Sequence, residues 1–166
     1  MVFLAEYQVV QDNLRRELAN AGDKRPEDVP YFVCVVKESY RVLPVSSMGS
    51  WRQAGRAFEV DGLVVPKGAL ILMPQILSNY DSRLFEDPET YSPERWENAS
   101  TEMIQAAHPF SYGSRSCIGQ SLAMAEINSI LPEMVSRVVL DLVDEGKPDF
   151  FLTSKFAGAR LKVRAV

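Results

Sequence analysis

The sequence is poor in the residues that build metal clusters and disulfide frameworks. Its 166 residues include one histidine and two cysteines. These residues cannot supply the four ligands of a structural zinc site, and two cysteines do not make a disulfide framework. No run of lysine and arginine is present, and the formal net charge is −4. The charge pattern therefore gives no reason to expect a nucleic-acid partner.

Long apolar runs are absent as well. No stretch approaches the ~20 residues that cross a bilayer, so we expect no membrane span in this chain. We also expect no signal peptide, because Met1 leads almost directly into an amphipathic segment in which Tyr7, Val10, Leu14 and Leu18 repeat at helical spacing. The content of 46% hydrophobic and 24% charged residues is that of an ordinary globular chain.

What the sequence does contain is one cysteine in an unusual setting. Cys117 lies in the stretch Phe110-Ser111-Tyr112-Gly113-Ser114-Arg115-Ser116-Cys117-Ile118-Gly119, and an apparent helix follows directly. Loop N–H groups, the positive end of that helix and the charge of Arg115 all favour the thiolate form. We therefore expect an anionic sulfur that binds a metal. The alternative is an ordinary buried thiol, the usual state of a free cysteine.

The pattern F-x-x-G-x-R-x-C-x-G resembles the haem-ligand signature of the cytochrome P450 family of haem-thiolate monooxygenases. Every specified position is filled, by Phe110, Gly113, Arg115, Cys117 and Gly119. The resemblance implies haem b (iron protoporphyrin IX) as the cofactor and Cys117 as its axial thiolate and catalytic residue. It also implies that Arg115 pairs with a haem propionate and that Phe110 packs beside the ring and the sulfur.

Two other residues are candidates for haem contacts because of their positions. Arg52 lies about where the family places a second propionate-binding arginine, although an ordinary surface arginine is nearly as good an interpretation. His108 precedes the cysteine loop and is within reach of a propionate, but for this residue we favour a structural role.

Two further motifs resemble the same family and stand upstream in the expected order. Glu38 and Arg41 match its E-x-x-R helix, and Arg95 lies in Pro93-Glu94-Arg95-Trp96, which is similar to the family's P-E-R-F/W segment. The resemblance implies that Glu38, Arg41 and Arg95 form a buried charged triad behind the haem loop. The alternative is a solvated i,i+3 pair on a helix face, worth a few tenths of a kcal/mol.

The resemblance implies a mainly α fold with small β-sheets (α+β), namely the C-terminal, haem-ligand part of the cytochrome P450 fold. We expect one partial domain over residues 1–166. Pro132 predicts a break in the helix after the cysteine near Asn128, and the tail predicts paired strands around Ala157-Gly158. The expected parts are the E-x-x-R helix 30–43, β-hairpins 56–73, the P-E-R-W segment 93–96, the haem-ligand loop 110–119, the following helix 118–139 and C-terminal strands 150–166.

The implied function is that of a haem-thiolate monooxygenase, or a fragment of one. Its partners would be O2, a small apolar organic substrate and an electron-donor reductase. We find no counterpart of the family's long oxygen-activating helix in these residues. The alternative is therefore a truncated, non-catalytic product that binds haem or a partner. The resemblance implies a location on the endoplasmic reticulum membrane, facing the cytosol, as is usual for eukaryotic members of the family. Because we expect no anchor or signal in this chain, its expected location is the cytoplasm or unknown.

Overall fold

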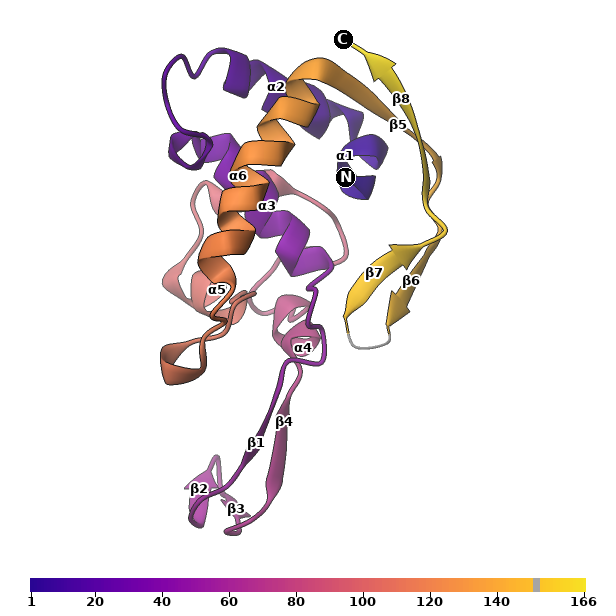
Figure 1. The fold of residues 1–166 in the computed structure, drawn as a ribbon. Helices are drawn as coiled ribbons and strands as arrows, with labels where there is room; N and C mark the ends of the chain where they lie inside the picture. Colours follow the sequence, from indigo (N-terminus) through magenta and orange to yellow (C-terminus); the bar gives the residue numbers. More distant parts are fainter. Residues whose placement is uncertain (151–152) are drawn as a thin grey trace.

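The computed structural model describes residues 1–150 and 153–166 as a helical body with two β extensions (Figure 1). The α-helices are α1 (Val2–Glu6), α2 (Gln8–Ala19), α3 (Pro30–Val42), α4 (Gln75–Asn79), α5 (Thr101–Ala106) and α6 (Gln120–Arg137). Short 3₁₀ turns are η1 (Pro26–Asp28), η2 (Pro93–Trp96) and η3 (Gly113–Arg115). The mixture of helices and small sheets agrees with the α+β class expected from the sequence.

The core lies where α2, α3 and α6 meet. Leu14, Phe32, Val35 and Val135 are at most 1% exposed and belong to one apolar cluster. Gln11, also fully buried, donates to the carbonyl of Leu140 and accepts from its N–H, at 2.9 and 2.8 Å. This amide satisfies both backbone groups of a buried strand residue, so it joins α2 to β5 (Val138–Asp144) without leaving either group unpaired.

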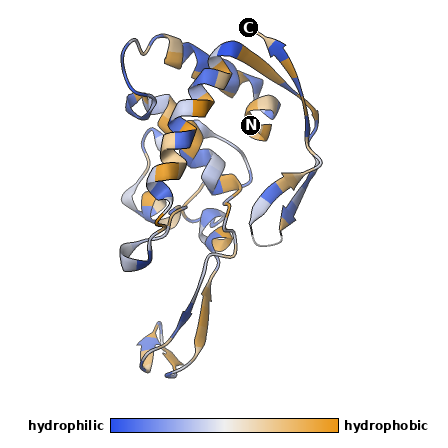
Figure 2. Ribbon diagram, in the orientation of Figure 1, coloured by the Kyte–Doolittle hydropathy of each residue, from blue (hydrophilic) through white to orange (hydrophobic). Residues whose placement is uncertain are grey.

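A long β-ribbon projects from the body below α4 (Figure 1). Strands β1 (Ser50–Gln53) and β4 (Leu70–Met73) form its stem, and β2 (Phe58–Val60) and β3 (Leu63–Val65) form its tip. The turn between β2 and β3 is the two-residue sequence Asp61-Gly62, which favours a tight hairpin and lies within the hairpins expected over residues 56–73. The sequence analysis missed β1, whose four residues are mostly polar beside the apolar β4 (Figure 2).

The expectation that the tail strands pair with each other was wrong. Strand β7 (Ser154–Ala157) pairs with β6 (Lys147–Phe150), and β8 (Arg160–Ala165) pairs with β5 (Val138–Asp144). The chain turns at Gly146, where a Cβ atom would lie 2.4 Å from the carbonyl oxygen of Ala157. Only glycine permits this approach, which lets the chain change pairing partner. Residues 151 and 152 of the expected tail strands lie outside the described residues.

The expected break in the helix after the cysteine is also absent. Helix α6 runs without interruption from Gln120 to Arg137 with Pro132 inside it, and residues 138 and 139 already belong to β5. Tertiary contacts hold its last turns in place. The side chain of Val135 is 1% exposed, and the guanidinium of Arg15 donates to the carbonyls of Val135 and Val138 at 2.9 and 3.1 Å. These contacts offset the free-energy cost of the hydrogen-bond donor that proline lacks.

Candidate functional site

A cavity of about 740 Å³ lies between the cysteine loop, the stem of the ribbon and the segment after α3. Its lining brings together Cys117, Phe110, Arg115 and Arg52, four of the site residues predicted from the sequence. His108 lines it too. The volume is in the range of small-molecule and cofactor pockets, roughly 300–1,000 Å³.

The loop that carries Cys117 is closed by its own backbone. The N–H of Cys117 donates to the carbonyl of Phe110 at 2.8 Å, so the backbones of these two residues meet at the base of one tight loop. Gly113 has a φ of +68°, a left-handed conformation that favours glycine, and its carbonyl accepts the N–H of Ser116. Gly119 is the N-cap of α6 with a φ of −85°, which any residue adopts.

The sulfur of Cys117 is open to a ligand. Cys117 is exposed, and in the part of the chain that the structure describes no N–H donates to its Sγ atom. This differs from the expectation that loop N–H groups would bind the thiolate. Cys34, the other cysteine, is 5% exposed and packs with Phe85 and Trp96, and burial raises the pKa of its thiol. Cys34 is therefore a residue of the core.

The pleat of β1 directs Arg52 toward the cavity. Arg52 pairs with Ile71 of β4 and lies two positions after Ser50, and Ser50 and its partner Met73 line the same cavity. Side chains at i and i+2 of a strand share one face. The remaining strand positions, such as Trp51 at 62% exposed, point to the opposite face. The sequence left open whether Arg52 belongs to the site or to the surface, and the structure places it on the cavity side.

His108 has both a structural contact and a place in the cavity wall. Its Nδ1 atom lies 2.8 Å from the carbonyl oxygen of Gln105, and its ring stacks on Tyr112 with centroids 4.7 Å apart. Because the Nδ1 atom is engaged at the end of α5, the ring is held in place at the start of the cysteine loop.

Behind the loop, Glu38 of α3 is the centre of a buried charged cluster. Its carboxylate is fully buried and accepts five hydrogen bonds at 2.8–3.0 Å. Arg41 donates twice, Arg95 once, and the N–H groups of Ser92 and the Trp96 indole supply the others. The structure thus brings Glu38, Arg41 and Arg95 together, and the i,i+3 pair does not lie on a solvated face.

The two arginines use their remaining N–H groups to fix the irregular segment between α4 and η2. Arg41, fully buried, donates to the carbonyls of Asn79, Pro88 and Thr90. Arg95 donates to the carbonyl of Thr90 at 3.1 Å as well. Segments with little regular secondary structure need such partners for their backbone groups.

Sequence reasoning missed two residues that connect this cluster to the cysteine loop. Trp96 donates to Glu38 at 2.8 Å, and Tyr40 meets the ring of Phe110 edge-to-face at 5.5 Å. Because Glu38 and Tyr40 are two residues apart, α3 presents one to the charged cluster and the other to the loop. The tryptophan had a usable signal, since a buried indole N–H needs an acceptor.

Two further observations concern metals and membranes. Among the described residues, no three histidine, cysteine, aspartate or glutamate side chains gather where they could hold a metal ion. None of the helices in the described ranges has both the length and the apolar character that crossing a membrane requires.

Comparison with known proteins decides the family. The family model for cytochrome P450 matches residues 1–163. The chain belongs to the cytochrome P450 family. It is 34% identical over 123 residues to cytochrome P450 monooxygenase traB of Penicillium crustosum, and 32% identical over 148 residues to cytochrome P450 monooxygenase btcC of Neocamarosporium betae. The resemblance stated from the sequence is therefore confirmed.

The chain is much shorter than these relatives. The two alignments cover 70% and 82% of this chain but only 24% and 29% of the cytochromes P450 that it matches. A solved cyanobacterial structure, retinoic acid-bound CYP120A1, superposes with a TM-score of 0.88 at 20% identity over 99% of this chain and 40% of its own. The fold is therefore that of a mixed α/β segment of a cytochrome P450.

Proposed function

We propose that this chain is the C-terminal, haem-binding part of a cytochrome P450 monooxygenase, in which the Cys117 thiolate would bind haem iron. The observation that carries the proposal is the composition of the 740 Å³ cavity. One exposed thiol and the two guanidinium groups of Arg52 and Arg115 line the same space. No other described cysteine is available, because Cys34 is buried.

The residues present fit haem b in their chemistry. Haem has a flat apolar ring with two propionates on one edge, and the cavity combines apolar walls with cationic groups. Val45, Met73 and Phe110 would contact the ring, and Arg52 and Arg115 would hold the propionates. A thiolate supplies the iron with the ligand typical of this family.

The chain's own residues would bind and position the cofactor. Cys117 would ligate the iron through a sulfur that no N–H of the described residues occupies. Tyr40 would hold Phe110 against the sulfur side of the loop, and the Glu38 cluster would keep α3 in place. Haem held by a thiolate supplies O2 activation, with electrons from a reductase, for insertion of one oxygen atom into an organic substrate. The proposal of a small apolar organic substrate rests on the family, since the apolar walls of this cavity would contact the haem ring.

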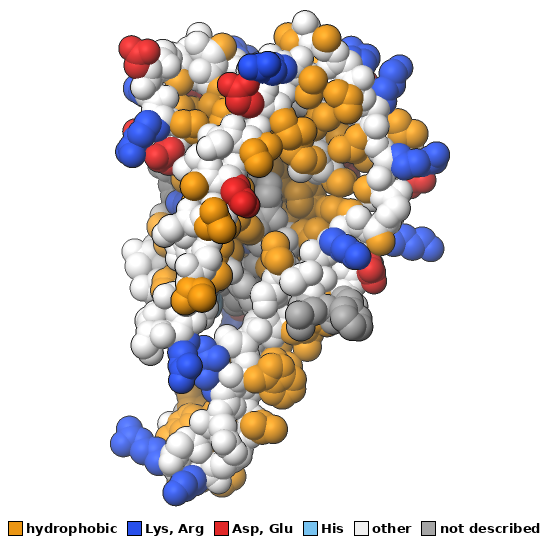
Figure 3. Space-filling view, viewed as in Figure 1, with side chains coloured by type: hydrophobic (Ala, Val, Ile, Leu, Met, Phe, Trp, Pro, Cys, Tyr) orange, Lys and Arg blue, Asp and Glu red, His pale blue; other side chains and the backbone are white. Residues whose placement is uncertain are grey.

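A second candidate function is haem or partner binding without turnover. It is favoured by apolar side chains that stay exposed next to Cys117 and along α6: Ile118 is 104% exposed, Leu122 66% and Ile130 56%. Figure 3 shows further apolar side chains gathered beside α6 and along the inner side of β5 and β8. Such a surface marks a place where more protein or a ligand packs. The haem site would then be incomplete in this chain taken by itself.

The test is a haem titration of the 166-residue chain, followed by reduction and addition of carbon monoxide. The wild type should give the strongly red-shifted Soret band of a thiolate-ligated haem, and Cys117→Ala should abolish it. Cys34→Ala is the matched control and should keep the band. A band that survives in Cys117→Ala would reject the ligand assignment. A thiolate band without oxidation of any apolar substrate in the presence of a reductase would favour the second candidate.

A further inference from the structure

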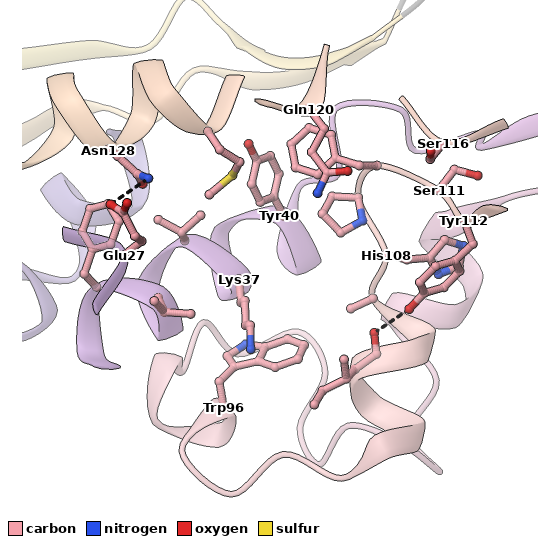
Figure 4. Close-up of a pocket in the computed structure, with 18 of the residues that line it drawn as sticks. Glu27, Lys37, Tyr40, Trp96, His108, Ser111, Tyr112, Ser116, Gln120 and Asn128 are labelled. Carbon is pink, nitrogen blue, oxygen red and sulfur yellow. Dashed lines mark hydrogen bonds between the residues drawn. The ribbon is translucent and has the colours of Figure 1, made fainter. Parts of the chain in front are cut away.

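A second cavity, of about 470 Å³, lies beside the first and is separate from the cysteine. It shares the wall formed by Tyr40 and residues 108–112, but Cys117, Arg52 and Arg115 do not line it. Its remaining walls come from η1, α3, η2, α5 and α6 (Figure 4). Nothing in the proposed haem function uses this space.

The walls suit a flat apolar molecule. Phe32, Val36 and Trp96 are buried side chains of the lining, and Ile104 and Met124 add further apolar surface. The indole of Trp96 lies across one side of the cavity, opposite α6 (Figure 4). An aromatic ring system would bury its faces against these groups.

One end of the cavity carries an unpaired acceptor. The Asn128 side chain donates from Nδ2 to Glu27 at 3.1 Å, which leaves its Oδ1 atom buried and, among the described residues, without a hydrogen-bond partner. Glu27 is already paired with Arg25 at 3.2 Å. A buried carbonyl oxygen without a donor costs free energy. The Oδ1 atom has less than 1 Å² of accessible surface, so the Asn128 side chain must turn toward the cavity before a ligand can reach it. A ligand hydroxyl that donates to the turned amide would then remove that cost.

The middle of the cavity carries a cation. Lys37 lies with its Nζ atom 5.6 Å from the centroid of the Trp96 ring, between Asn128 at one end and His108 at the other (Figure 4). In the described ranges no carboxylate lies within ion-pair distance of Lys37. A carboxylate on a ring stacked near Trp96 would form an ion pair with this ammonium group.

From these three features we infer that the second cavity is a binding site for an aromatic acid that carries a hydroxyl group. The ring lies among Phe32, Val36 and Trp96, the carboxylate pairs with Lys37, and the hydroxyl donates to Asn128. The site is independent of haem, so it can be tested on the chain without cofactor. Its failure would leave the Cys117 proposal untouched.

The probe is 6-hydroxy-2-naphthoate, titrated into the 166-residue chain by calorimetry. Lys37→Met should weaken binding about 10-fold, as loss of a charged hydrogen bond does. Asn128→Ala should weaken it about 2- to 10-fold, the range of a neutral hydrogen bond. Lys67→Met, which removes an exposed lysine of the ribbon, is the matched control and should leave the affinity unchanged.

Two comparisons locate the ligand. For wild type, 2-naphthoate should bind about 2- to 10-fold more weakly than the hydroxy acid, whereas Asn128→Ala should bind the two equally. In a Trp51→Phe variant Trp96 is the remaining tryptophan. Excitation of its indole should then transfer energy to the bound naphthoate and appear as naphthoate fluorescence. Absence of binding to the wild type would overturn the proposal. So would a loss of binding in Arg52→Gln while Lys37→Met binds normally, because that result would place the acid in the Cys117 cavity.

Discussion

Replacement of Glu38 by alanine is the sharpest test of how the fold supports the site. The carboxylate is fully buried and accepts five hydrogen bonds from Arg41, Arg95, Ser92 and Trp96. Its removal leaves the fully buried Arg41 guanidinium without its counter-ion. Breaking a buried pair by removing one partner costs about 3–5 kcal/mol. A domain is stable by about 5–15 kcal/mol, so Glu38→Ala should lose a large part of its free energy of unfolding.

The measurement is urea unfolding followed by far-UV circular dichroism, because Trp96 fluorescence would change with the loss of its own hydrogen bond. Glu133→Ala is the matched control. It removes one partner of the ion pair with Arg137, an i,i+4 pair of the same chemical type with side chains 64% and 76% exposed. We expect a change within about 0.5 kcal/mol there. If Glu38→Ala and Glu133→Ala lost equally small amounts of unfolding free energy, Glu38 would not be the residue that holds the charged cluster together.

Three further predictions follow from individual residues. Gly113→Ala should cost about 1 kcal/mol of stability because of its φ of +68°, whereas Gly119→Ala should cost less, as measured by the same unfolding assay. Near neutral pH, a thiol reagent followed by mass spectrometry should modify the exposed Cys117 quickly and the buried Cys34 slowly, since burial limits access to the Cys34 thiol and raises its pKa; raising the pH should speed the modification of Cys34, and equal rates for the two thiols near neutral pH would contradict this reasoning. Pro132→Ala should raise the unfolding free energy, by up to about 3 kcal/mol, because it restores a helix N–H; a loss of stability would show that the proline is required.

Residues in motifs could be placed well from the sequence, because their chemistry is local. The loop around Cys117 depends on residues within a few positions, and its closing hydrogen bond joins Cys117 to Phe110. The charged cluster is different, since Arg95 lies 57 positions from Glu38. Only the family resemblance, and no periodicity, brought these two side chains together in advance.

Pairing between strands could not be predicted in the same way. The tail strands pair with β5 and β6 because Gly146 packs against the carbonyl of Ala157, a contact that depends on tertiary structure. The polar β1 has no apolar alternation, so its strand character comes from hydrogen bonding to β4. The position of Arg52 in the site depends on this unpredicted strand.

Local rules also failed where packing outweighs them. Pro132 predicts a break in an isolated helix, but Val135 in the core and the bonds from Arg15 hold the turns that follow it. Similarly, Tyr40 reads as an ordinary helix residue, and its contact with Phe110 emerges only when α3 and the cysteine loop meet. Both cases show that tertiary contacts, rather than propensity, position the parts of the site.

The most direct test of the central claim is X-ray absorption at the iron K edge of the haem-loaded chain. The account predicts one sulfur atom in the first coordination shell of the iron for wild type and for Cys34→Ala. It predicts no sulfur for Cys117→Ala. An iron shell made only of nitrogen and oxygen atoms in the wild type, or a sulfur that persists in Cys117→Ala, would contradict it.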